Sequence, residues 1–131
     1  MTGGYFAVSV ADLDASQRWY EEKLGLDVVL QPPAASGVAI VVLRGEGLIV
    51  ELIHQDTGVS PADVVPALAD RTLLHGFAKA GAIVGDLDAV LAQLRARGVP
   101  IKFGPYAATS DQPANLIIED NEGNLIQFIG S

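Results

Sequence analysis

Two pairs of aspartates have a spacing that could serve acid–base chemistry. Asp12 and Asp14 form the first pair, and Asp86 and Asp88 form the second. Neighbouring carboxylates can act as acid and base when their environments separate their pKa values. Each pair, however, precedes a helical pattern, where an aspartate side chain accepts hydrogen bonds from free N–H groups of the first turn. Helix capping explains all four residues, and we do not interpret them as catalytic.

Other residue types exclude further kinds of site. The chain has no cysteine, so it can form no disulfide, no thiolate zinc site and no cysteine nucleophile. It has two histidines, and two histidines among common serines match a Ser/His/Asp triad only by chance. Gly3-Gly4 is not a phosphate-binding loop, because no Gly-Lys-Ser/Thr follows it.

Size and charge limit the possible partners. The chain has 131 residues, the length of one domain, and half of them are hydrophobic. Sixteen acidic residues against eight basic ones give a net charge of −8, which repels the phosphates of nucleic acids. No apolar run approaches the roughly 20 residues of a membrane span. We therefore expect no nucleic-acid or membrane partner and a cytoplasmic location.

An internal repeat predicts the elements that position any site. Val10–Ala15 recurs 74 residues later as Val84–Ala89, with five of six positions identical. Each copy follows an apolar stretch and precedes a helical pattern that ends in glycine, and each half closes with a glycine turn before an apolar strand. Two copies of so long a unit indicate a duplicated supersecondary structure.

Both copies have the order β-α-β-β-β. The first has expected strands at Tyr5–Val10, 27–30, 37–44 and 48–54, with a helix over 16–24 that Asp12 or Asp14 caps and Gly25 ends. The second has expected strands at 77–84, 100–103, 114–119 and 124–129, a helix over about 88–97, and a loop over 104–113. We expect a single domain over residues 1–131, made of two modules at about 1–54 and 76–131. The linker, 55–75, contains a short helix starting at Ser60-Pro61.

The repeat belongs to a recognisable set of motifs. These are Val8–Ser16 followed by Trp19-Tyr20 and Leu24-Gly25, the second copy Val84–Ala89, and the closing Asp120–Gln127. With these motifs the chain resembles the vicinal oxygen chelate superfamily, which includes glyoxalase I, extradiol dioxygenases, fosfomycin-inactivating enzymes and bleomycin-binding proteins. The resemblance implies an α+β fold of two βαβββ modules, whose curved mixed sheets form a cup with the helices outside. It also implies a homodimer, in which modules pair around a site within one chain or across two.

The resemblance also identifies the positions at which family enzymes hold a divalent metal. In this chain they are Tyr5, Glu51, Lys79 and Gln127. Glu51 is a good ligand for a hard metal ion and Gln127 is an acceptable neutral one, but the Lys79 ammonium has no acceptor and repels a cation. His54 should face the opposite side of its strand from Glu51, and His75 precedes Lys79 by roughly 13 Å of extended chain. We expect no metal and no other cofactor.

Three functions remain compatible with this quartet. The first is a metal-free binder of a small molecule, possibly of a cationic antibiotic, contacted by Tyr5, Glu51, Lys79 and Gln127, with Tyr106 at the rim. The second is a lyase, isomerase or dioxygenase-type enzyme with an atypical metal site or with Glu51 and Lys79 as catalytic acid and base. The third is a non-catalytic dimer whose cavity is filled by a Glu51–Lys79 ion pair. We favour the first.

Overall fold

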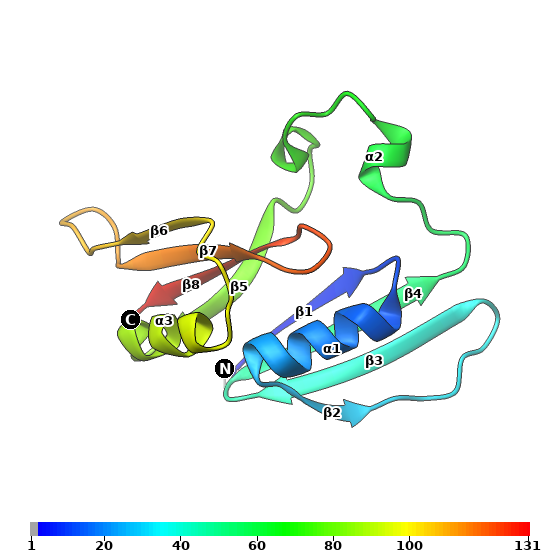
Figure 1. Ribbon diagram of the computed structural model, residues 1–131, viewed down its shortest axis with the longest axis horizontal. Helices are drawn as coiled ribbons and strands as arrows, with labels where there is room; N and C mark the ends of the chain where they lie inside the picture. Colours follow the sequence, from blue (N-terminus) through cyan, green and yellow to red (C-terminus); the bar gives the residue numbers. More distant parts are fainter. Residues whose placement is uncertain (1–2) are drawn as a thin grey trace.

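The two sequence repeats fold into two four-stranded mixed sheets, each with a helix on one face (Figure 1). The computed structural model describes residues 3–131. The first module contains β1 (Gly4–Ser9), α1 (Leu13–Leu24), β2 (Asp27–Leu30), β3 (Val38–Gly45) and β4 (Leu48–Gln55). The second contains β5 (Lys79–Val84), α3 (Leu87–Ala96), β6 (Phe103–Tyr106), β7 (Asn115–Glu119) and β8 (Leu125–Gly130). This is the α+β fold of two βαβββ modules, with curved sheets and outer helices, that the sequence predicts.

The two sheets have the same strand order and register. The orders are β1-β4-β3-β2 and β5-β8-β7-β6, with the first pair of each parallel and the others antiparallel. Ala7 pairs with Glu51 in the first sheet, and Gly81 pairs with Gln127 in the second. These registers agree with the alignment of the two repeats.

Alternation along the strands gives each sheet a helix-covered face and an open face. Val50 and Leu52 are fully buried beneath the helix layer, whereas Glu51 between them is only partly buried. Because successive side chains point to opposite faces, Tyr5 and Glu51 share the open face of the first sheet. Lys79 and Gln127 share the open face of the second sheet by the same reasoning.

Both long helices are capped by an aspartate, as the sequence predicts. The Asp12 carboxylate accepts a hydrogen bond from Ala15 N at 2.9 Å, and the Asp86 carboxylate accepts one from Ala89 N at 2.9 Å. Each helix therefore starts earlier than the apolar pattern alone suggests, at Leu13 and Leu87. Gly25 ends α1 with a φ of 67°, a conformation that glycine adopts without strain.

The two modules share one hydrophobic core. Buried residues of both sheets form a single cluster, to which Tyr20 of α1 and Leu94 of α3 also belong. Trp19 and Tyr20 pack against this core, as expected, and Phe128 is buried on the helix side. Lys23 at the end of α1 donates a hydrogen bond to Arg97 O beyond α3 at 2.8 Å. The helix-covered sides of the two modules thus pack against each other.

The turn after β7 ties the second module to the first. Asp120 is 94% buried and accepts a hydrogen bond from the Tyr20 hydroxyl at 2.8 Å, and it also accepts bonds from Glu122 N and Asn124 N within its own turn. The Glu122 carboxylate accepts hydrogen bonds from Ala11 N and Asp12 N at 2.8 and 3.0 Å. Burial and the adjacent Asp120 carboxylate raise the pKa of the Tyr20 hydroxyl far above its ordinary value. We call residues 120–124 the docking turn.

The segment between the modules contains α2 (Pro61–Val64) and the short 3-10 helix η1 (Arg71–Leu73). Pro61 starts α2 and Ser60 occupies the capping position before it, as predicted, although the Ser60 side chain makes no capping hydrogen bond. The Arg71 guanidinium donates to Asn124 Oδ1 at 2.6 Å and to Glu122 O at 3.0 Å. The docking turn therefore anchors this segment as well.

Strand ends differ from the prediction in the second module. The strand expected at 100–103 is β6, which spans Phe103–Tyr106, so the expected loop over 104–113 begins too early. Tertiary pairing explains the difference: Phe103 and Tyr106 pair with Ile117 and Asn115 of β7 despite the Gly104-Pro105 sequence between them. Phe77 and Ala78 precede β5, which begins at Lys79.

Two remaining predictions concern the start of the first module and membrane-spanning helices. The expected first module begins at residue 1, and residues 1–2 lie outside the described part of the chain. Within residues 3–131, no helix has the length and apolar character needed to cross a membrane.

Candidate functional site

The polar group on the open face of the first sheet is a tyrosine–glutamate pair. The Tyr5 hydroxyl on β1 donates a hydrogen bond to Glu51 Oε2 on β4. This bond to a carboxylate raises the pKa of the Tyr5 hydroxyl above its ordinary value. Tyr5 is 61% exposed and Glu51 is half-buried, so the pair is accessible to a ligand. It offers a carboxylate oxygen as an acceptor and an aromatic edge beside it.

The open face of the second sheet carries Lys79, Gln127 and Tyr106 around one cavity. This cavity has a volume of about 420 Å³, and Asn115, Ile117 and Ile129 also line it. Gln127 Nε2 donates to Asn115 Oδ1 at 3.1 Å, which fixes the orientation of both amides. Lys79 and Tyr106 are exposed at its border. The structure therefore brings three of the five expected contact residues together.

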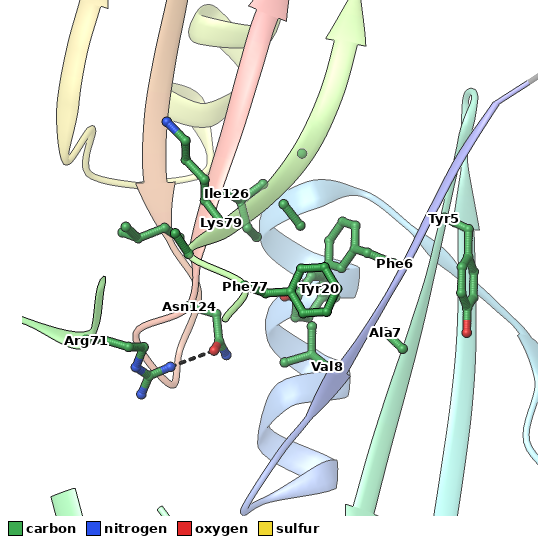
Figure 2. A pocket seen from close by; sticks show the side chains of 14 residues that line it. Tyr5, Phe6, Ala7, Val8, Tyr20, Arg71, Phe77, Lys79, Asn124 and Ile126 are labelled. Carbon is green, nitrogen blue, oxygen red and sulfur yellow. Dashed lines mark hydrogen bonds between the residues drawn. The ribbon is translucent and has the colours of Figure 1, made fainter. Parts of the chain in front are cut away.

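The two polar groups do not meet within the chain. The expected Glu51–Lys79 ion pair is absent from residues 3–131, where the ion pairs join His54 to Asp56 and Lys102 to Glu119. Figure 2 shows why: Tyr5 and Lys79 lie on opposite sides of the view, and their polar ends point in opposite directions. The strands that carry them, β1 and β5, are the edge strands of different sheets. The quartet therefore does not form one polar group within the described residues, although Tyr5 and Lys79 both border a second cavity.

A separate cavity lies at the seam where β1 and β5 meet. We call it the seam cavity; its volume is about 610 Å³, and Figure 2 shows the side chains that line it. Its walls come from β1, β5, the start of β8, the interior side of α1, and the connecting segment. Tyr5 borders this cavity, and Lys79 borders both this cavity and the one on the open face.

Arg71 and Phe77 are seam residues that the sequence analysis did not identify. Arg71 is held at the cavity by its bonds to the docking turn, and the Phe77 side chain is fully exposed. Arg71 belongs to the linker at 55–75, which has no counterpart in the repeat to align with. Phe77 is the first residue of the strand expected at 77–84, but this position does not indicate which way the ring points.

His54 makes local contacts at the end of β4, and His75 lies in the connecting segment. His54 Nδ1 lies 2.9 Å from Val10 O, and its Nε2 lies 3.4 Å from the Asp56 carboxylate. His54 is thus a residue at the end of β4, as expected. His75 is exposed in the connecting segment. Within residues 3–131, no three His, Asp or Glu side chains are grouped closely enough to hold a metal ion.

Several solved structures have the same fold. A glyoxalase/bleomycin resistance protein/dioxygenase domain from Frankia sp. EAN1pec is 20% identical, with a TM-score of 0.74 and coverage of 98% of this chain and 95% of that one. The antibiotic-binding protein TnmS3 from Streptomyces sp. CB03234 is 21% identical, with a TM-score of 0.65 and coverage of 98% and 93%. A lactoylglutathione lyase from Agrobacterium tumefaciens is 19% identical, with a TM-score of 0.64 and coverage of 97% and 91%.

Sequence comparison extends the similarity from fold to family. No curated protein matches this chain significantly. The family model of the glyoxalase/bleomycin resistance protein/dioxygenase superfamily matches residues 3–128, which is nearly the whole sequence. Together with the duplicated βαβββ fold, this match shows that the chain belongs to the glyoxalase/bleomycin resistance protein/dioxygenase superfamily.

Proposed function

We propose that this protein is a homodimer that binds a small organic molecule without a metal ion. The observation that carries the proposal is the Tyr5–Glu51 hydrogen bond, which engages the best metal ligand of the quartet with a protein hydroxyl. The similarity to an antibiotic-binding protein, TnmS3, supports an antibiotic as the first ligand class to test. We place this binder in the cytoplasm as part of the same proposal.

The donor set does not suit a divalent metal. Of the four family positions, Glu51 alone carries a carboxylate, and Gln127 is a neutral amide already bonded to Asn115. Tyr5 has a raised pKa and so remains a neutral hydroxyl at physiological pH. Lys79 would place a positive charge beside the ion. Imidazole and further carboxylate ligands, which such a site needs, are missing from these positions.

A second copy of the chain completes the site in this proposal. The first-sheet pair Tyr5–Glu51 of one protomer would face the second-sheet group Lys79–Gln127 of its partner. Ile83, which lies on the same face of β5 as Lys79, is 75% exposed and would be covered by such an interface.

The first experiment measures bound metal and then ligand affinity. We expect protein purified without a chelator or metal resin to contain no stoichiometric nickel, zinc, manganese or iron, and no thermal shift on adding them. Sedimentation should show a dimer. A thermal-shift screen that begins with cationic antibiotics, chosen because the net charge is −8, should then yield a ligand whose binding Lys79→Ala abolishes. Lys102→Ala is the matched control, since Lys102 pairs with Glu119 on the surface.

Other outcomes would favour the alternatives. Stoichiometric metal that is lost in Glu51→Gln would contradict the proposal and lead to assays for lyase, isomerase or dioxygenase activity. Glu51 and Lys79 could act as acid and base only around a shared ligand, so that alternative also needs a second copy. A dimer that binds no ligand, and in which Lys79→Ala changes only stability, would indicate a filled cavity.

A further inference from the structure

We propose that the seam cavity is a second ligand site, which binds a planar aromatic or apolar molecule carrying one carboxylate group. The cavity lies between the edges of the two modules, and of the quartet only Tyr5 and Lys79 border it. The proposal does not depend on the function proposed above, because neither Arg71 nor Phe77 belongs to the quartet or lines the cavity on the open face.

The size and walls of the seam cavity suit a small apolar molecule. Its volume of about 610 Å³ falls within the range of roughly 300–1,000 Å³ found for small-molecule sites. Most of its wall is hydrocarbon, from Phe6, Val8, Ala78, Ala80, Leu125 and Ile126. Burying an apolar ligand against such walls is favourable because both surfaces leave water.

The charged residues that line this cavity favour an anionic ligand. Arg71 and Lys79 are its charged lining residues, and no aspartate or glutamate lines it. This is notable in a chain with a net charge of −8. A ligand with one negative group at the edge of an apolar body complements such a lining. Carboxylate is the group we propose, since the planar guanidinium of arginine matches its geometry in a two-point contact.

Arg71 is already positioned for this contact. Its guanidinium has five N–H donors, and the bonds to Asn124 Oδ1 and Glu122 O account for one donor each. The remaining donors stay available to a ligand. Because the docking turn holds the side chain in place, binding would cost little additional conformational entropy.

Phe77 supplies a stacking surface that the fold does not use. Its side chain is fully exposed although it lines the cavity, and Figure 2 shows its ring among the lining residues. An aromatic side chain left entirely in water contributes no packing to the core. A planar ligand would cover one face of this ring in an offset stack.

Titration calorimetry of the intact protein with 2-naphthoate and with 2-naphthamide tests the proposal. The two molecules have the same shape and differ in charge. We expect 2-naphthoate to bind once per chain, and the neutral amide to bind about tenfold more weakly or worse, as for the loss of a charge-assisted hydrogen bond. Failure of naphthoate to bind at millimolar concentration, or equal affinity for both molecules, would overturn the proposal.

Matched variants then locate the bound naphthoate. Arg71→Gln should weaken its binding about tenfold, and Phe77→Ala should weaken it a few-fold to about tenfold. Phe103→Ala is the control for Phe77, because Phe103 is also exposed, at 44%, and does not line the seam. Gln127→Ala is the control for the open face. Both controls should bind within about twofold of the wild-type affinity.

Two results would show that naphthoate binds elsewhere or that the exposed Phe77 ring has another explanation. Loss of naphthoate binding in Gln127→Ala with full binding in Phe77→Ala would place the ligand on the open face. Dissociation of a dimer by Phe77→Ala, measured by sedimentation, would show that a second copy covers the ring. Either would overturn the proposal. Phe77→Ala keeps the test informative even if Arg71→Gln disturbs the docking turn, because the Phe77 side chain makes no core contact.

Discussion

The two turns that close the modules occupy equivalent places in the repeat but have different roles. The docking turn, residues 120–124, bonds to α1, to the β1–α1 junction and to Arg71. Its counterpart in the first module joins β3 to β4 and contains Glu46, the repeat equivalent of Glu122. Glu46 is exposed and borders a groove beside Gly85 and Asp86, the equivalents of Ala11 and Asp12.

The difference between the turns rests on two substitutions. Asp120 corresponds to Arg44, and Tyr20, which donates to Asp120, corresponds to Leu94. The second module therefore has a buried carboxylate where the first has an exposed guanidinium. A duplicated unit can thus keep the same backbone while only one copy carries the polar connection between modules. The following variants test this comparison, from the largest expected effect to the smallest.

Removal of the Asp120 carboxylate should have the largest effect. Asp120→Ala leaves the buried Tyr20 hydroxyl and the N–H groups of the docking turn without their acceptor. We expect a loss of roughly 3 kcal/mol in the free energy of unfolding, measured by urea denaturation. Arg44→Ala, at the equivalent position, should change it by less than about 0.5 kcal/mol. Equal losses in both variants would contradict the asymmetry.

The central strand pairs provide a second comparison. Gly81 is the repeat equivalent of Ala7, and a methyl group at Gly81 would collide with the backbone carbonyl of Gln127. We expect Gly81→Ala to destabilise the protein by about 2 kcal/mol, as for overpacking elsewhere. Ala7→Gly should cost about 1 kcal/mol or less. A Gly81→Ala variant as stable as the wild type would show that β5 and β8 can separate freely.

The two equivalent glutamates should differ by a smaller amount. Glu122→Ala removes the acceptor for Ala11 N and Asp12 N, so we expect a loss of about 1–2 kcal/mol. Glu46→Ala should be neutral within about 0.5 kcal/mol. Thermal unfolding of the pair under identical conditions measures the difference. A Glu46→Ala variant that is as unstable as Glu122→Ala would mean that both turns connect the modules.

The smallest expected effect is spectroscopic and concerns the open faces. Because the Glu51 carboxylate accepts the Tyr5 hydrogen bond and raises the pKa of that hydroxyl, Glu51→Gln should lower this pKa toward its ordinary value of about 10. The phenolate absorbance should then rise at lower pH in an alkaline titration. The change should vanish when Tyr5→Phe is added to both proteins. An unchanged titration would contradict the hydrogen bond.

Much of the fold could be predicted from the repeat. Asp12 and Asp86 mark the starts of both long helices, and the strand registers that pair Ala7 with Glu51 and Gly81 with Gln127 follow the repeat alignment. The position of β6 could not be predicted, because Gly104-Pro105 disfavours a strand locally and pairing with β7 decides it. The seam residues could not be predicted either, since Arg71 lies in the linker, outside the repeat, and the place of Phe77 at a strand end does not determine the direction of its ring.

The sequence by itself determined the α+β class, the duplication, the helix caps and the identity of the four side chains at the family positions. The first three depend on local patterns with periods of two or 3.6 residues and on the alignment of one half with the other, and the four positions follow from the resemblance to the family. The tertiary structure alone decided which of the four meet. Tyr5 reaches Glu51 because parallel strands bring them together, and Lys79 stays apart because β5 is the edge of another sheet. Contacts between elements far apart in sequence depend on how the two modules dock, and no local pattern records that.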